Sequence, residues 1–247
     1  WTLAACSGSE PPAAAEHLTG SEAPTQPAAG SPPSAKAEEP DLAAHMQASF
    51  WMAVRARDAL IAGDLAAAQR AGDALAAQDY MHLVPADWKH WVVSMQHYAR
   101  ELSMAPNPAA AGQELGRLAL VCGDCHDLHQ RGPERVRPEP EPWRDPPEEL
   151  EARMLRHQIG AEQLWEGLVL PSETSFRSGI TTLTRAPLRA PERRGEPIDE
   201  AMNARIEKVR ALAKAARAAT TYEARGQVYG ELIATCADCH AFARPAP

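Results

Sequence analysis

The sequence has few aromatic residues and no long apolar run, and both absences limit the folds it can adopt. Phe, Trp and Tyr together make up 5% of the 247 residues, while alanine is abundant. Strands favour β-branched and aromatic residues, and alanine is the best helix former, so the composition predicts an all-α fold. No stretch of about 18 apolar residues occurs, so no membrane-spanning helix is predicted.

An excess of basic residues is also missing, because the formal net charge is −8. A nucleic-acid surface needs a basic face. Neither DNA nor RNA is therefore expected as a partner.

No cysteine is left over for a structural disulfide. Four of the five cysteines stand in two Cys-x-x-Cys-His motifs, and the fifth is Cys6. The motifs close two similar segments, GQELGRLALVCGDCH at 112–126 and GQVYGELIATCADCH at 226–240, which are offset by 114 positions. The chain is therefore predicted to contain an internal repeat.

Proline is absent from 41–84, 148–170 and 198–244, and these stretches carry the helical pattern. In the first half we predict helices over 41–63, 65–78, 86–103 and 108–126; in the second half we predict them over 147–170, 172–185, 197–219 and 221–240. Asn107 before Pro108 predicts a capped helix start. The architecture expected is two tandem four-helix bundles, 41–131 and 148–247, joined by a Pro-rich linker at 132–147.

The Cys-x-x-Cys spacing places two thiols about one helical turn apart on one face. Such a pair can add to the two vinyl groups of one haem, and the histidine that follows presents its imidazole to the iron. The motifs therefore predict two covalently bound haem c groups, attached through Cys122, Cys125, Cys236 and Cys239 and ligated by His126 and His240. The alternatives are one zinc ion shared by four thiolates and a thioredoxin-like redox pair. The wide separation of the pairs disfavours zinc, and the lack of a βαβ pattern disfavours the redox pair.

Each half resembles cytochrome c′ and its low-spin relatives, antiparallel four-helix bundles that carry this motif on the last helix. The resemblance covers 41–129 and 148–244 and rests on CGDCH, CADCH and the helix pattern before them. Residues 45–68 also look like the tandem haem-bundle lipoproteins of some bacteria. The resemblance implies a dihaem cytochrome c that passes single electrons between redox protein partners and is not an enzyme. If a distal site is open, as in cytochrome c′, it implies instead a protein that binds NO or CO.

The resemblance also implies a sixth iron ligand on the first helix of each half, a methionine in the low-spin relatives. Two helical stripes at an offset of 108 supply candidates: Met46, Ser49, Ala53, Ala56 and Leu60, and Met154, His157, Ala161, Leu164 and Leu168. Met46 is the candidate for the first haem, with His45 as the alternative. Met154 and His157 compete for the second haem. Open sites, or methionines that only pack the core, remain alternatives in both halves.

The segment Leu3-Ala4-Ala5-Cys6 resembles the lipobox of a bacterial lipoprotein. On this interpretation residues 1–6 are a signal-peptide remnant and Cys6 carries a lipid anchor. Residues 7–40, rich in Pro, Ala, Ser and Gly, are predicted to be a disordered tether. The expected location is the periplasmic side of a bacterial membrane, with Ser7 favouring the outer membrane.

Four further residues are given structural roles. Gly116 and Gly230 are costly in a helix interior, so they are predicted to mark a close approach to haem or to a neighbouring helix. Trp51 and Trp165, on the first helix of each half, are predicted to pack in the interior of the bundle.

Overall fold

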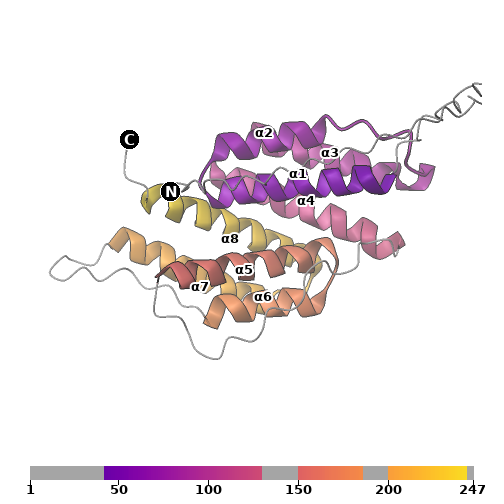
Figure 1. Cartoon of the computed structure of the whole chain (residues 1–247). Coiled ribbons are helices and arrows are strands. Elements are labelled where there is room, and N and C mark those ends of the chain that lie inside the picture. The colour runs from indigo at the N-terminus through magenta and orange to yellow at the C-terminus, as the bar shows by residue number, and fades with distance from the viewer. Residues whose placement is uncertain (1–41, 130–149, 186–199, 244–247) are drawn as a thin grey trace, which may run out of the picture. The chain divides into compact units, whose positions relative to one another are not determined.

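The computed structural model describes residues 42–129, 150–185 and 200–243, and all the regular structure in these ranges is helical. The prediction of an all-α fold is confirmed for this part of the chain (Figure 1). The helices are α1 (Leu42–Ile61), α2 (Leu65–Ala76), α3 (Lys89–Met104), α4 (Pro108–His129), α5 (Leu150–Val169), α6 (Glu173–Arg185), α7 (Glu200–Ala218) and α8 (Tyr222–Ala243), with a short 3₁₀ turn, η1 (Ala86–Trp88), before α3.

The helix ends lie within about three residues of the predicted ones because the capping residues are local signals. The side chain of Asn107 accepts a hydrogen bond from the Ala110 N–H at 2.9 Å, as its place before Pro108 predicts. Asp64 caps α2 in the same way through the Ala67 N–H, also at 2.9 Å. The start of the third predicted helix differs, because residues 86–88 form η1 and the α-helix begins at Lys89.

The two predicted stripes are buried. Ser49, Ala53, Ala56 and Leu60 on α1 and His157, Ala161, Leu164 and Leu168 on α5 all lie in the interior, while Met46 and Met154 are partly buried. Trp165 is 1% exposed, as predicted, but the prediction for Trp51 is wrong, because its side chain is 50% exposed. Trp51 lies outside the stripe, so the helical period turns it away from the core.

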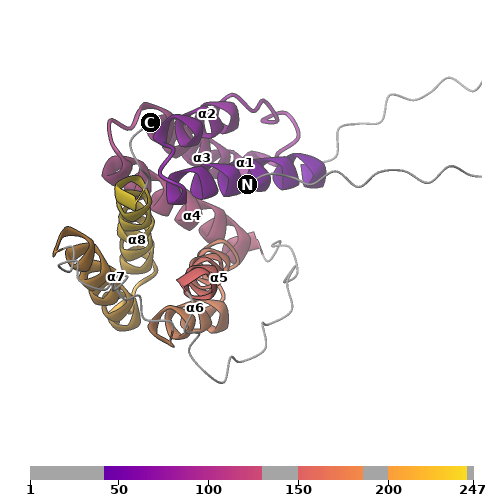
Figure 2. The same cartoon turned by 60° about the vertical axis from the view of Figure 1, so that its left-hand side comes forward.

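Helices α1–α4 contact one another in chain order, with α4 also touching α1. Helices α5–α8 repeat this arrangement, with α8 touching α5. The two sets meet through their last helices, α4 and α8, which lie side by side in Figures 1 and 2. Buried residues of both sets form one hydrophobic cluster within the unit Glu39–Pro247, so the two halves share a core.

Glycines make the contact between α4 and α8 possible. A Cβ on Gly112 would lie 2.3 Å from the carbonyl oxygen of Gly230, and a Cβ on Gly116 would lie 2.3 Å from that of Gly226. The pairing is reciprocal, since a Cβ on Gly230 would lie 2.4 Å from the carbonyl oxygen of Gly112. The close approach predicted at Gly116 and Gly230 is therefore to a neighbouring helix, and each repeat contributes the same surface.

Several predictions fall outside the described residues. They are the signal remnant 1–6 with Cys6, the tether 7–40 and the linker 132–147. Among the helices described, none has the length and apolar character needed to cross a lipid bilayer.

Candidate functional site

The two Cys-x-x-Cys-His motifs lie on the packed pair of helices. Cys122 and Cys125 are on α4, Cys236 and Cys239 are on α8, and all four are free, partly exposed thiols. A spacing of three residues places the two sulfurs of each pair on one helix face. Each motif therefore holds two free thiols on one face of its helix.

The thiols are protonated at neutral pH. Burial, followed by the neighbouring Cys125, raises the pKa of Cys122 to about 12. Burial and the neighbouring Cys239 likewise raise the pKa of Cys236 to about 12. Burial also raises the pKa of Cys125 and of Cys239. The structure thus holds the sulfurs as neutral S–H groups and contains no activated thiolate among them.

The two motif histidines are held by main-chain carbonyls. Nδ1 of His126 lies 2.8 Å from the carbonyl oxygen of Val169, the last residue of α5. Nδ1 of His240 lies 2.5 Å from the carbonyl oxygen of Ile61, the last residue of α1. Each histidine is thus oriented by a helix end from the other half of the chain.

These carbonyls are available because the last carbonyls of a helix have no partner within it. At the end of α1 the Ala62, Gly63 and Asp64 N–H groups donate to the carbonyls of Asp58, Leu60 and Ala59. Gly63 has a φ of +75°, the left-handed conformation that closes a helix in this way. The Ile61 carbonyl takes no part in these three hydrogen bonds and accepts one from Nδ1 of His240.

The contact decides which imidazole nitrogen carries the proton. A carbonyl oxygen can only accept, so Nδ1 of His126 and of His240 must donate. In the neutral ring the lone pair is then on Nε2, which is the atom left for a metal. Metal-bound histidines in proteins commonly show this arrangement, because the Nδ1 bond fixes the ring and raises its basicity.

Several polar side chains surround the first motif. The hydroxyl of Tyr80, a residue with no exposed surface, donates to the sulfur of Met95 at 3.5 Å and accepts from Ser49 at 3.4 Å. Burial raises the pKa of Tyr80, and Cys122 and Cys125 are close enough to raise it further. The ring of His45 stacks on that of Tyr80 with centroids 5.6 Å apart. Of the two candidates for the first haem, His45 therefore contacts this cluster, while Met46 packs against the core.

A surface pocket adjoins the second motif. It is lined by His240 and Ala243 of α8, by Asp58, Ile61 and Ala62 at the end of α1, and by Gln158 of α5. Of the two candidates for the second haem, His157 precedes Gln158 and is 8% exposed, and Met154 lies one turn earlier with part of its side chain exposed. Both candidates thus lie on the helix that forms one wall of this pocket.

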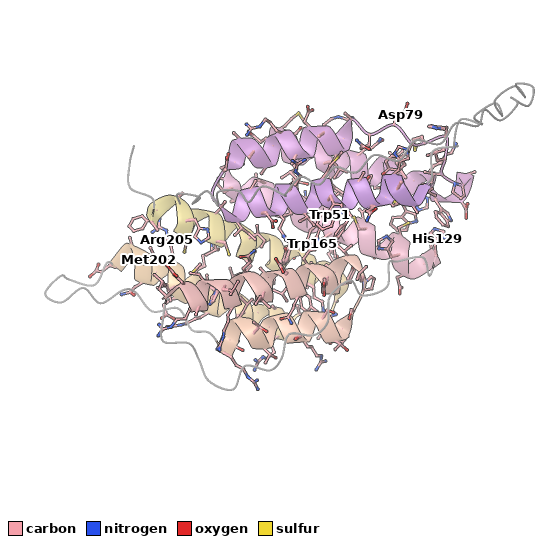
Figure 3. All side chains as sticks on the ribbon, viewed as in Figure 1. Trp51, Asp79, His129, Trp165, Met202 and Arg205 are labelled. Atoms are coloured by element: carbon pink, nitrogen blue, oxygen red, sulfur yellow. The ribbon has the colours of Figure 1, made fainter. Side chains whose placement is uncertain are left out.

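One arginine pairs with the second motif, and a second arginine lies beside Trp165. Arg205 of α7, which is labelled in Figure 3, pairs with Asp238, inside the motif, with 2.8 Å between Nε and Oδ2. Arg57 of α1 is 3% exposed and its guanidinium lies 5.8 Å from the ring of Trp165. In Figure 3 Trp165 lies on the side of α5 that faces α1.

The sequence did not predict most of the side chains that surround the two motifs. Tyr80 and Tyr222 lie beside the first motif in space but tens of residues away in sequence, and Arg57 lies beside Trp165. The local sequence pattern of all three is that of ordinary helix or turn residues. One signal was present for Arg57, since it occupies the repeat position of Trp165 and so marks a difference between the halves.

The two thiol pairs do not converge on one ion. Within residues 42–129, 150–185 and 200–243, no group of three or more His, Cys, Asp or Glu side chains is placed to hold a metal ion. This range contains both motifs complete. The arrangement disfavours the single zinc site considered above.

Comparisons with known proteins bring no relative to this chain. No protein-family model, no curated protein and no solved structure matches it.

Proposed function

We propose that the chain is a dihaem c-type cytochrome, built from two cytochrome c′-like four-helix bundles in tandem, that transfers single electrons between redox proteins. The haems would be attached at Cys122 and Cys125 and at Cys236 and Cys239. His126 and His240 would be the proximal iron ligands. No substrate chemistry is proposed beyond electron transfer.

The observation that carries this proposal is the matched orientation of the two motif histidines. Both follow a pair of free thiols, and both have Nδ1 on a helix-terminal carbonyl, at 2.8 Å for His126 and 2.5 Å for His240. A histidine kept only for packing has no need of a fixed tautomer. Two histidines in the same state, each beside two thiols, fit a ligand that joins to sulfur and is coordinated by nitrogen.

The thiols fit covalent attachment without an added oxidant. In thioether formation the sulfur bonds to the vinyl carbon next to the porphyrin ring, and the thiol hydrogen ends on the outer vinyl carbon. The raised pKa values of Cys122 and Cys236 keep that hydrogen on sulfur before the reaction. Once bound, the haem iron supplies a one-electron couple, and the protein fixes its ligands, its polarity and its access to water.

The sixth ligand decides between electron transfer and gas binding. The candidates remain Met46 or His45 for the first haem and Met154 or His157 for the second. A side chain on the iron would make it low-spin and unreactive towards CO. An open site would leave a high-spin iron that binds CO or NO, which is the alternative function.

The location follows from the lipobox interpretation. We propose that Cys6 carries a lipid anchor that holds the protein on the periplasmic side of a bacterial membrane, with the outer membrane favoured. The tether 7–40 would hold the haem-binding helices away from the lipid surface. Attachment of haem through thioethers takes place outside the cytoplasm, which agrees with this location.

The test is to count haem after export in a host that matures c-type cytochromes. Two covalent haems per chain are expected, with one left in a Cys122→Ala/Cys125→Ala variant and one in the matched Cys236→Ala/Cys239→Ala variant. Colourless wild-type protein would refute the proposal. Absorption spectra of the reduced protein with and without CO then distinguish electron transfer from gas binding.

A further inference from the structure

The ends of α1 and α5 are the same turn of the repeat, and one of the differences between them removes a main-chain hydrogen-bond donor. In α1 the Gly63 N–H donates to the Leu60 carbonyl at 2.9 Å. At an offset of 108, Leu168 corresponds to Leu60, and Pro171 stands at the position of Gly63. Proline has no N–H, so the Leu168 carbonyl lacks the main-chain donor that its counterpart has.

The hydroxyl of Tyr222 takes the place of this donor. Tyr222 is the first residue of α8, and its hydroxyl donates to the Leu168 carbonyl. The outer bond of the turn is kept, since the Ser172 N–H donates to the Gly167 carbonyl at 3.0 Å. The closure of α5 is therefore completed by a side chain from another helix. Pro108, at the start of α4, occupies the repeat position of Tyr222. Proline has no hydroxyl, so this position cannot donate a side-chain hydrogen bond to the turn at the end of α1.

This turn lies directly against the first motif. Val169, which follows Leu168, is the residue whose carbonyl orients His126. Gly123, inside the motif, leaves the necessary space, because a Cβ there would collide with both the Tyr222 hydroxyl and the Leu168 carbonyl oxygen. The second motif has Ala237 at this position.

We propose that Tyr222 is a positioning residue for the first haem site, which supplies the hydrogen bond missing at Pro171 and so fixes the Val169 carbonyl that orients His126. The inference rests on the proposed function, since it concerns the iron that His126 would bind. A firm hydrogen bond on Nδ1 makes the imidazole more basic and favours ferric over ferrous iron. Without the Tyr222 hydroxyl the turn loosens, the bond weakens, and the reduction potential of the first haem rises.

The test is an optical redox titration of the dihaem protein and its Tyr222→Phe variant, which keeps the ring and removes only the donor. A change of up to about tenfold in the ferric-to-ferrous equilibrium of one haem is expected, which is about 59 mV for a one-electron couple. The same shift should appear in the Cys236→Ala/Cys239→Ala background, which keeps only the first haem. No shift should appear in the Cys122→Ala/Cys125→Ala background.

A rescue experiment separates the hydrogen bond from general packing. Pro171→Gly restores an N–H at the position where Gly63 has one. The double variant Tyr222→Phe/Pro171→Gly is expected to return the potential towards the wild-type value. Tyr98→Phe on α3 is the control for a tyrosine hydroxyl lost elsewhere.

Three results would overturn the inference. They are an unchanged first haem in Tyr222→Phe, an equal shift of both haems, and a double variant that is not rescued. Each leaves two haems attached, so each differs from a failure of the proposed function, in which the wild-type protein carries no haem.

Discussion

Substituting Gly116 by alanine tests the crossing of α4 and α8, on which both candidate sites depend. Alanine is favoured over glycine in a helix by about 1 kcal/mol. Against this, the new Cβ would lie 2.3 Å from the Gly226 carbonyl oxygen, and its next neighbours are also main-chain atoms of α8. Extra volume in a packed core costs about 1–3 kcal/mol, and the upper end applies because a helix backbone cannot rotate aside. The net expectation is a loss of about 2 kcal/mol of unfolding free energy.

Gly226→Ala is the matched control, because it is the same change at the same crossing with a different neighbour. The three atoms nearest to its new Cβ, at 2.6–2.9 Å, all belong to the side chain of Leu120. A partly buried leucine can change rotamer, so the packing cost and the gain in helix propensity should nearly cancel.

Urea unfolding of the two variants and the wild-type protein, followed by far-ultraviolet circular dichroism, measures the difference. A gap of about 2 kcal/mol between the two variants corresponds to about 4–8 °C in melting temperature for a chain of this size. If Gly116→Ala is as stable as Gly226→Ala, the helices do not approach at glycine, and the reasoning fails.

Two further predictions concern helix ends. Asn107→Ala removes the acceptor of the Ala110 N–H at the start of α4 and should cost about 1 kcal/mol in the same unfolding assay, with Asn107→Ser close to wild type; no loss would contradict the capping role. Hydrogen bonds from Arg177 and then from Arg225 hold the pKa of Glu173 below its ordinary 4.5, so the carboxylate stabilises the folded protein fully above pH 4.5. The stability difference between wild type and Glu173→Gln should therefore shrink as the pH falls through the lowered pKa, and a pH-independent difference would refute the ion-pair argument.

The helices could be predicted from the sequence because their signals are local. Proline-free stretches, the cap at Asn107 and the buried stripes from Ser49 to Leu60 and from His157 to Leu168 depend on residues within one or two turns. Trp51 lies outside the buried stripe of α1, which is why the prediction that it packs in the core is wrong. The thiol pairs and their histidines are equally local, since the whole motif spans five residues.

The surroundings of the motifs could not be predicted, because they are made by the main chain of distant helices. Nothing in the residue types of Ile61 and Val169 indicates that their carbonyls orient His240 and His126. Any residue at a helix end offers such a carbonyl, and only the packing decides which donor reaches it. The proposed role of Tyr222 could not be predicted either, because it depends on Pro171, some 50 positions earlier in the chain.

The reciprocal contacts have the pattern of a symmetric dimer joined into one chain. In a two-fold interface each surface meets its own copy, so a contact from one side recurs from the other. Gly112 meets Gly230 while Gly116 meets Gly226, and His126 is held by α5 while His240, its repeat counterpart, is held by α1. Each half thus supplies the thiols and the imidazole of one candidate site and the orienting carbonyl of the other. A half expressed alone would keep its motif but lose the group that fixes the histidine. The repeat symmetry makes the two candidate sites alike. Gly63 and Pro171 are repeat counterparts that break this symmetry, so the two sites can differ in their properties there.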